Sequence, residues 1–332
     1  MLRRRFIPVL LLALCAPFAA ASDTDSHDGG KKDAPADAIV ITGASGGLAG
    51  ETIDELLARN VSPDRLILVT RTPEKLSFLA ERGAQIRHGD FTKPDGLPAA
   101  FAGGKQMLLI STSGGDRVAQ HTAAIDAARR AGIRHIVYTS WVNAVPENPA
   151  AVTRDHRLTE EAIRKSGIPY TILRNQLYAE GLIEKGRRAV ASGILLSNSG
   201  RGVWAPVSRR DCAAAAAVVL TTPGHEGQTY EITGPDLISQ HDFAAMLTQV
   251  TGKPVRVVDV SDATYIEMLV KSGMSPEGAK VAASFGIATR MSAINIKSDA
   301  LEILLGHPPQ SVRDLLARNK AQLLVPVSGA GR

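Results

Sequence analysis

The chain has 332 residues, of which 44% are hydrophobic and 21% charged, so it is long enough to bury a full hydrophobic core. Its formal net charge of +5 is modest for that length, and Arg3, Arg4 and Arg5 supply part of it. Aromatic residues make up 4% and the other basic residues are scattered, which argues against a nucleic-acid partner. We therefore expect a globular chain without a nucleic-acid surface.

The first 21 residues predict a secretory signal peptide. Three arginines precede the apolar stretch Phe6 to Phe18, and the small residues Ala19 to Ala21 offer a cleavage site. The order Arg3 to Ile7 is similar to the twin-arginine pattern of bacterial proteins exported after folding, and a general secretory signal is the alternative. Because the apolar stretch is short and contains proline, we expect no stable membrane span after cleavage, with an uncleaved anchor as the other interpretation. The pattern predicts export, to the bacterial periplasm.

The mature chain is expected to begin with a disordered linker and to lack disulfides. Residues 22–37 are polar and contain almost no large apolar side chains. Cys15 would leave with the signal, so Cys212 has no partner for an intramolecular disulfide.

The segment from Ala38 to Gly50 is an apolar strand pattern that breaks into a glycine-rich turn and then into a helical pattern. Backbone N–H groups left uncovered at the start of such a helix favour a pyrophosphate. The turn, Gly43-x-x-Gly46-x-x-Ala49, is a variant of the dinucleotide-binding fingerprint. It predicts a nucleotide site formed by Gly43, Ala44, Ser45, Gly46, Gly47 and Leu48.

Strand and helix patterns alternate after this unit. Further strands are expected at 65–70, 84–88, 106–110, 133–139 and 169–174, and helices after 72 and at 97–101, 118–131 and 154–166. This alternation predicts an α/β fold of the NAD(P)-binding Rossmann type, a doubly wound parallel sheet with ligands at the carboxyl ends of its strands.

The rhythm changes in the second half of the chain. We expect a helix at 210–221, a strand at 229–233, a helix at 239–251 with Ser239 as its N-cap, a strand at 255–260 and a mostly helical remainder. The predicted organisation is a Rossmann domain over 38–180, to which later segments return, and a small, mostly helical C-terminal substrate lobe over 181–332.

The residues after the second strand favour NADP(H) over NAD(H). An acidic side chain at this position would accept hydrogen bonds from the ribose 2′-hydroxyl, but the chain has Thr70-Arg71-Thr72. Because a guanidinium binds a 2′-phosphate and stacks on adenine, Arg71 points to NADP(H). Asp90 and Phe91, after the third strand, are placed to approach the adenine ring, and a simple turn is the alternative.

The helix after the fifth strand lacks the Tyr-x-x-x-Lys pair with which short-chain dehydrogenases transfer a proton. It carries Asp155, His156 and Glu160 instead, and His156 and Glu160 share one helix face. Alcohol dehydrogenase chemistry is therefore not expected.

Several motifs run in order through most of the mature chain. They are Thr42-Gly-Ala-Ser-Gly46, Arg71-Thr-Pro-Glu-Lys75, Gly89-Asp90, Arg117-Val-Ala-Gln-His121, Ile136-Val-Tyr-Thr-Ser140, Asp155-His156 with Glu160, Gly167-Ile-Pro-Tyr-Thr-Ile-Leu-Arg-Asn175, Tyr178-Ala-Glu180, Arg209-Arg-Asp211 and Thr251-Gly-Lys-Pro254. In these motifs the sequence resembles the quinone oxidoreductase 2 family, an NmrA-like branch of the atypical short-chain dehydrogenases.

The resemblance implies NADPH-dependent hydride transfer to quinones or other conjugated acceptors, with no metal. A reduced quinone is a stabilised phenolate, so the protein mainly has to position the reactants, and water can supply the proton. By position, the cofactor would meet Ser111, Thr112, Ser113, Thr139 and His156; Ser140, His156 and Tyr178 would be catalytic; and Trp141, Asn143, Asn175 and Tyr178 would face the acceptor. An alternative for His156 is a structural pairing with Glu160.

The chain departs from the family pattern near the acceptor. The family often has Asn-Gly-Trp-Tyr-x-Glu-Asn, whereas this chain has Asn175-Gln-Leu-Tyr178-Ala-Glu-Gly181, which leaves the acceptor open. A second hypothesis is a regulatory protein that senses redox state by binding NADP(H) without turnover. An isomerase or epimerase is less favoured because such enzymes usually keep the Tyr/Lys pair.

Overall fold

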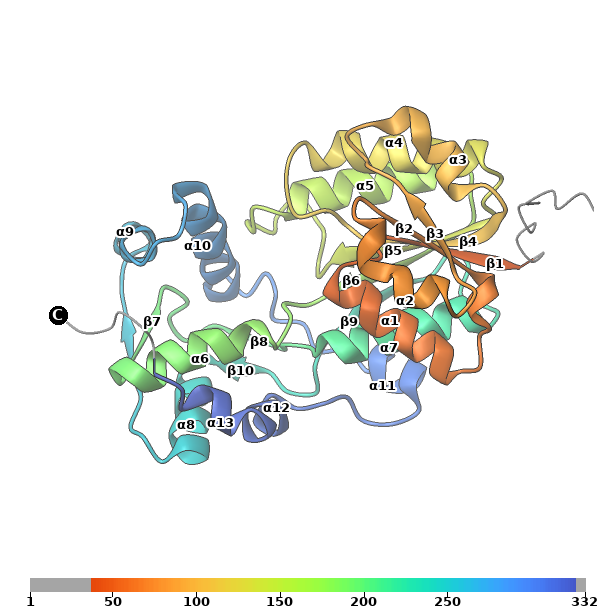
Figure 1. Ribbon diagram of the computed structural model, residues 1–332. Helices are drawn as coiled ribbons and strands as arrows, with labels where there is room; N and C mark the ends of the chain where they lie inside the picture. The colour runs from red at the N-terminus through yellow and green to blue at the C-terminus, as the bar shows by residue number, and fades with distance from the viewer. Residues whose placement is uncertain (1–36, 327–332) are drawn as a thin grey trace, which may run out of the picture. The chain divides into compact units, whose positions relative to one another are not determined.

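The structure is a computed structural model that describes residues 37–326 (Figure 1). The predicted signal, 1–21, and the predicted linker up to residue 36 lie outside the described residues. A seven-stranded sheet with the order β3-β2-β1-β4-β5-β6-β9 forms the centre, and every neighbouring pair is parallel. Its strands are β1 Ala38–Thr42, β2 Leu66–Thr70, β3 Gln85–His88, β4 Gly104–Leu109, β5 His135–Trp141, β6 Tyr170–Asn175 and β9 Thr229–Ile232. The predicted α/β, doubly wound fold is confirmed.

The strand order reverses between β1 and β4, and this places the ligand site. Ile41 of β1 pairs with Leu68 of β2 on one side and with Leu108 of β4 on the other. The chain leaves the carboxyl end of β1 toward β2, and that of β4 toward β5, so the two connections diverge there. In open parallel sheets the crevice at such a point receives the ligand.

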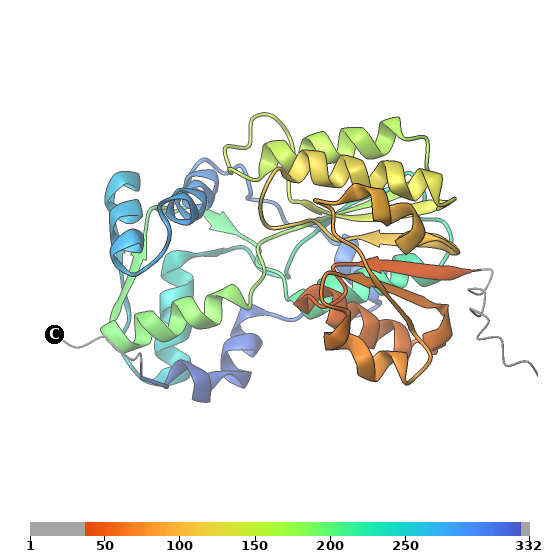
Figure 2. The ribbon, with the colours of Figure 1, turned by 45° about the horizontal axis from the view of Figure 1, so that its top comes forward.

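Helices cover both faces of the sheet (Figure 2). One face carries α3 Leu97–Phe101, α4 Arg117–Arg130 and α5 Thr153–Lys165, and the other carries α1 Gly47–Ala58, α2 Ser77–Ala80, α7 Arg209–Thr221 and α11 Ala300–Leu305. The apolar runs in the strands are explained by burial on both faces. Ala213 and Ala217 of α7 are fully buried, and their small size lets α7 pack close to α1. Three 3₁₀ turns, Pro63–Arg65, Pro73–Leu76 and Pro94–Gly96, each begin with proline.

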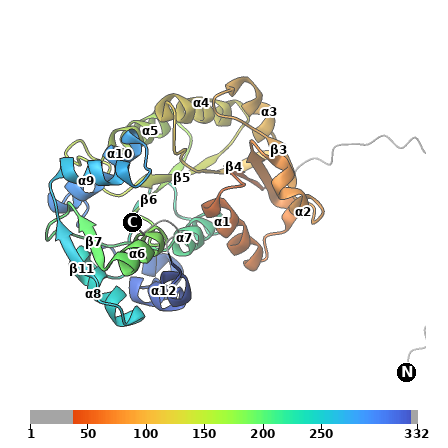
Figure 3. The same cartoon turned by 60° about the vertical axis from the view of Figure 1, so that its left-hand side comes forward.

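The later part of the chain contains a separate apolar cluster around Phe243, which is fully buried. The cluster draws on α6 Gly181–Ser192, β7 Ile194–Ser197, β8 Val203–Trp204, β10 Ile238–Ser239, α8 Gln240–Thr251, β11 Arg256–Asp259, α10 Pro276–Arg290, α12 Val312–Arg318 and α13 Lys320–Leu323. Helix α9 Asp262–Lys271 has no buried residue and packs against α10. Helices α6, α8 and α12 lie together (Figure 3). Ser239 caps α8 as predicted, in a capping box with Asp242. Helix α6 and strands β7, β8 and β10 were not predicted. As expected, later segments return to the large sheet: β9 joins it and α7 covers one face. The division into two domains stays a prediction.

Three hydrogen bonds join the segment around the end of α10 to the loops after β5 and β6. Asn143 Nδ2 donates to the Ala293 carbonyl at 2.7 Å, and Gln176 Nε2 donates to the Ile294 carbonyl at 3.0 Å. The Ala151 N–H donates to Ser284 Oγ at 3.0 Å. These contacts fix the loops that follow the carboxyl ends of two central strands.

Candidate functional site

The glycine-rich turn forms an open cradle at the start of α1. Gly43 has φ +60°, a backbone conformation that a residue with a Cβ rarely adopts. The Gly46 N–H donates to the Gly43 carbonyl at 2.8 Å, and a Cβ at Gly46 would lie 3.1 Å from that oxygen. Helix α1 begins at Gly47, has no side-chain cap and carries no acidic residue in its first turn. Its first N–H groups are therefore free of side-chain partners and suit a pyrophosphate, while Ala44 and Leu48 are buried beneath the turn.

Arg209 of α7 also lies at this cradle, although it was not among the predicted site residues. Its Nε donates to Glu51 Oε1 at 2.8 Å, and its guanidinium lies beside Gly47. Its backbone N–H donates to both carboxylate oxygens of Glu180, at 3.0 and 3.1 Å. The sequence feature that could have identified it is the motif Arg209-Arg-Asp211. The position of this motif in the chain does not reveal that Arg209 lies near α1.

The end of β2 presents hydroxyl groups and the guanidinium of Arg71. Ser45 Oγ lies 2.8 Å from Thr70 Oγ1 and accepts from Thr72 Oγ1 at 3.2 Å. Arg71 is exposed and, within residues 37–326, takes part in no ion pair. The guanidinium of Arg71 therefore lies where the adenosine ribose of the cofactor is predicted to bind, and it can pair with a 2′-phosphate.

Asp90 forms a local turn after β3. Its Oδ1 accepts from the N–H and the hydroxyl of Thr92 at 2.9 and 2.8 Å, and these bonds, more than the charge of Arg71, lower the pKa of Asp90. Phe91 is half-buried and packs against the cluster that contains Phe101. The Asp90 carboxylate therefore stabilises a local turn, which was the alternative interpretation of this segment. Contact of Asp90 and Phe91 with the adenine ring stays a prediction.

A pocket of about 330 Å³ lies at the carboxyl ends of β4 and β5, beside the glycine-rich turn. It brings together most of the residues expected along the cofactor path; its lining is Leu48, Ile110, Ser111, Thr112, Ser113, Arg117, Thr139, Val152 and Tyr178. Thr139 Oγ1 accepts from the Ser111 N–H at 3.0 Å, and His121 Nε2 accepts from the Thr112 N–H at 3.0 Å. These bonds fix the loop after β4 so that its hydroxyl groups border the pocket.

Tyr178 enters the pocket as a hydrogen-bond donor. Asn175 Nδ2 donates to the Tyr178 hydroxyl at 3.3 Å, which leaves the phenol proton free for another acceptor. Although 36% of Tyr178 is exposed, burial around its hydroxyl and then the neighbouring Cys212 raise its pKa. The phenol therefore keeps its proton at neutral pH and can donate it in a hydrogen bond to a ligand.

Ser140 and His156 lie outside the pocket lining. Ser140 Oγ is buried and donates to Glu160 Oε1 at 2.7 Å. His156 contacts Arg117 and Tyr138, not Glu160, so the alternative of a His156–Glu160 pair is wrong. The physical reason is that Glu160 is already bound by two arginines: Arg174 in a bidentate pair at 2.8 and 2.9 Å, and Arg164 at 3.0 Å. Direct catalytic roles for Ser140 and His156 stay predictions.

Trp141 and Asn143 are also absent from the pocket lining. Trp141 is buried and packs on Phe285 of α10, with ring centroids 5.3 Å apart. Asn143 has φ +48° and is held through its N–H by Glu231 Oε2 at 3.1 Å. The structure therefore places them at the junction with α10, and their contact with an acceptor stays a prediction.

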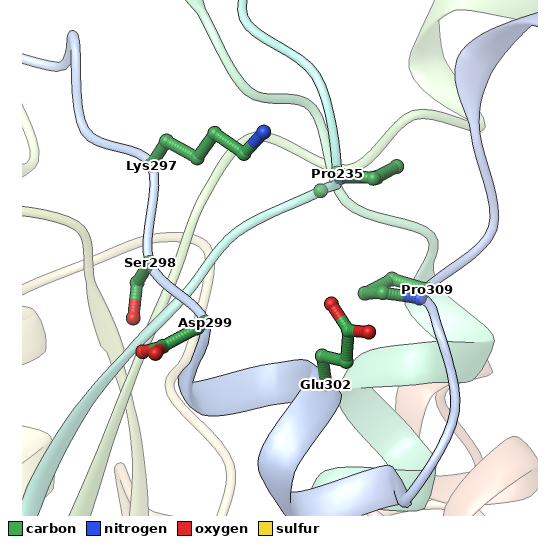
Figure 4. A pocket seen from close by; sticks show the side chains of 7 residues that line it. Pro235, Lys297, Ser298, Asp299, Glu302 and Pro309 are labelled. Atoms are coloured by element: carbon green, nitrogen blue, oxygen red, sulfur yellow. The ribbon is translucent and has the colours of Figure 1, made fainter.

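A second, larger hollow of about 740 Å³ lies between the loop after β9 and the start of α11 (Figure 4). Its lining is Gly234, Pro235, Lys297, Ser298, Asp299, Glu302 and Pro309, none of which was predicted as a site residue. In the part of the chain that the structure describes, no group of three or more His, Cys, Asp or Glu side chains is arranged to hold a metal ion. None of the helices between residues 37 and 326 combines the length and the apolar character needed to cross a membrane.

Comparison with known proteins agrees with this geometry. Residues 43–223 match the family described as NAD(P)H-binding. Quinone oxidoreductase 2 of Escherichia coli is 34% identical over 277 residues, which cover 83% of this chain and 96% of that protein. The solved structure of the E. coli NADPH-dependent quinone oxidoreductase with NADPH superposes with a TM-score of 0.81, at 33% identity over 86% of this chain and all of that chain. The triphenylmethane reductase of Citrobacter sp., complexed with NADP(H), gives a TM-score of 0.78 at 35% identity, with the same coverage of both chains.

Proposed function

The chain belongs to the NAD(P)H-binding family of quinone oxidoreductase 2-like reductases, and on this basis we propose that it reduces quinones or similar conjugated acceptors. It is an NAD(P)H-dependent reductase, and NADP(H) is its cofactor. The proposal that the acceptor is a quinone or a similar conjugated compound is supported by two solved relatives. Their names give a quinone and a triphenylmethane as the compounds they act on.

The observation that carries the proposal is the pocket beside the glycine-rich turn. It offers hydroxyl groups, one cation and apolar walls, but no Tyr/Lys pair on α5 borders it. Reduction of a simple ketone needs a proton donor because an alkoxide is a poor product, whereas a reduced quinone is a stabilised phenolate. A pocket that positions reactants without a strong acid therefore suits quinone-like acceptors.

Different residues of the chain would bind the phosphates of the cofactor and the acceptor. The N–H groups of Gly47 and Leu48 would hold the pyrophosphate, and Arg71 would bind the 2′-phosphate. When bound, NADPH supplies a hydride. Ser111, Thr139 and Tyr178 border the space next to that site, and Tyr178 would donate a hydrogen bond to an acceptor oxygen.

The test is an assay of NADPH oxidation by the purified protein, lacking residues 1–21, with benzoquinone-type acceptors and with simple ketones as controls. We expect turnover with quinones and little with ketones. NADPH binding without turnover on any acceptor would support the redox-sensing alternative instead.

We also propose that the protein is exported to the periplasm, and residues 1–21 are the basis of this proposal. Export in the folded state would let the protein acquire NADP(H) in the cytosol before transport. A reporter fused after residue 37 tests this: activity confined to the cytosol contradicts export, and replacing Arg3 to Arg5 by lysines discriminates between the two export routes.

A further inference from the structure

Arg117 is the one charged residue among the nine that line the pocket. It is the first residue of α4 and follows the loop that carries Ser111, Thr112 and Ser113. The other lining side chains are hydroxyl-bearing or apolar. A single cation in a pocket without carboxylates favours a ligand atom that carries negative charge.

His156 of α5 holds this guanidinium in position. Arg117 Nη2 donates to His156 Nε2 at 2.7 Å. Since a guanidinium only donates, Nε2 is the unprotonated nitrogen, and Nδ1 donates its proton to the Tyr138 hydroxyl at 2.9 Å. Burial, and then the charges of Arg117 and His121, lower the pKa of His156 well below its ordinary value. The imidazole is therefore neutral at pH 7 and orients Arg117 without cancelling its charge.

Between residues 37 and 326 no carboxylate forms an ion pair with Arg117. The two acidic residues nearest in sequence to Arg117 and His156 have other partners: Asp116 accepts from the Ala119 N–H at 3.0 Å, and Asp155 lies 3.6 Å from Arg154. Arg117 Nε is buried and has no hydrogen-bond partner among the described residues. No acidic side chain among the described residues neutralises the Arg117 guanidinium, so its charge is left to attract a negatively charged ligand atom in the pocket.

We propose that Arg117 binds the oxygen of the acceptor that becomes negatively charged on reduction, and that His156 is its positioning residue. This inference rests on the proposed function. A quinone that takes up one hydride equivalent gains two electrons and one proton, so one oxygen is protonated and the other is left anionic. Arg117 stabilises that anion and the transition state that leads to it, and water later supplies the second proton. The substrate class is thus narrowed to acceptors whose reduced form carries an oxyanion.

The experiment measures binding, not turnover. 4-Nitrophenol is titrated into the protein at several pH values, with and without NADP⁺, and its absorbance reports whether the bound form is the phenol or the coloured phenolate. We expect the wild-type protein to prefer the phenolate. Arg117→Met should weaken phenolate binding about tenfold or more, because it removes a hydrogen bond between charged groups, while the affinity for NADP⁺ changes little. Arg130→Met, an exposed arginine at the other end of α4, is the matched control.

Two further variants test the role of His156 and guard against a simple loss of folding. Arg117→Lys keeps the charge and should retain part of the phenolate preference. His156→Phe, which cannot accept from Arg117, should reduce that preference, and His156→Gln, which offers an amide oxygen as acceptor, should restore it. Rescue by glutamine would not follow from a role in packing alone.

Four outcomes separate the inference about Arg117 from the proposed function. Equal phenolate affinity in Arg117→Met and wild type, or no phenolate binding by wild type, overturns the inference. A loss in Arg117→Met that falls on NADP⁺ alone also overturns it, because Arg117 would then serve the cofactor. Failure of the wild-type protein to bind NADP⁺ contradicts the proposed function instead. In that case the 4-nitrophenol titration without NADP⁺ still tests whether Arg117 binds the phenolate.

Discussion

Arg209 lies over Gly47, the first residue of α1, so closely that a Cβ on this glycine would be 2.8 Å from Arg209 Nη1. The two residues are far apart in sequence, and Glu51 and Glu180 on the same surface hold the arginine in place. A glycine at position 47 thus makes room for a guanidinium at the helix end that would bind a pyrophosphate.

From this relationship we expect Arg209→Met to weaken NADPH binding about threefold to tenfold, since it removes a partly exposed cation beside the phosphate site. The measurement is a fluorescence titration of NADPH at low salt. The neighbouring Arg210, which is more exposed and pairs with Glu55, gives the matched control Arg210→Met, with a change under about twofold. Equal effects of the two substitutions would show that Arg209 acts only through general charge.

Arg71 should decide the choice between NADPH and NADH. Arg71→Ala is expected to reduce the preference for NADPH about tenfold or more, because it removes the cation available for the 2′-phosphate, and to leave NADH binding nearly unchanged. The ratio of the two dissociation constants is the readout, with the exposed Arg82→Ala as control. A preference for NADH in the wild-type protein, or an unchanged ratio in Arg71→Ala, would exclude this role.

Glu160 should be essential for stability rather than for the cofactor. Its carboxylate is fully buried and satisfies Ser140, Arg164 and Arg174. An arginine stays charged at neutral pH, and Arg174 would keep only its pair with Glu231 at 3.1 Å after Glu160 is neutralised. Glu160→Gln should therefore lower the unfolding free energy by about 3–5 kcal/mol, as expected when one partner of a buried ion pair is lost.

Denaturant unfolding tests this expectation, and Glu161→Gln on the same helix is the control. Glu161 is 38% exposed in its side chain and pairs with Arg157, so its substitution should cost less than about 1 kcal/mol. A loss of similar size in both variants would contradict the structural role given to Glu160.

His121 should make the fold sensitive to acid. Burial, and then the charge of Arg117, lower the pKa of His121 to about 4, below its ordinary value of 6.5. Between these two pH values the unfolded chain binds more protons than the folded protein, so the contribution of His121 to stability is complete above pH 6.5 and declines as the pH falls toward 4. We expect the unfolding free energy to be on the order of 1–2 kcal/mol lower at pH 5 than at pH 7 from this group.

The check is a set of unfolding curves from pH 7 to pH 4.5 for wild type, His121→Gln and the exposed control His241→Gln. His121→Gln should flatten the dependence, because glutamine does not titrate and can still accept from the Thr112 N–H. Parallel pH profiles for all three proteins would mean that other groups cause the acid sensitivity.

The local elements of the large sheet were predictable because each depends on side chains close in sequence. The apolar run at Ile39, Val40 and Ile41 predicted a strand buried on both faces, and β1 is fully buried. Ser239 predicted the start of α8 as its N-cap, and the structure confirms this cap and adds the reciprocal bond from Asp242. Helix α6 was not predicted, since its buried face includes Gly186, whose neighbours Leu247, Leu323 and Phe243 come much later in the chain.

By itself, the sequence determined the fold class, the glycine-rich turn, the absence of a carboxylate after β2 and the absence of a Tyr/Lys pair on α5. These follow from local periodicity and from residue types at fixed positions along strand–turn–helix units. Only the tertiary structure decided what surrounds the pocket: that His156 binds Arg117 and Tyr138 rather than Glu160, and that Arg209 reaches Gly47. The reason is that these contacts join residues distant in sequence, and the partner of a buried polar group is set by which helices and strands the packing brings together.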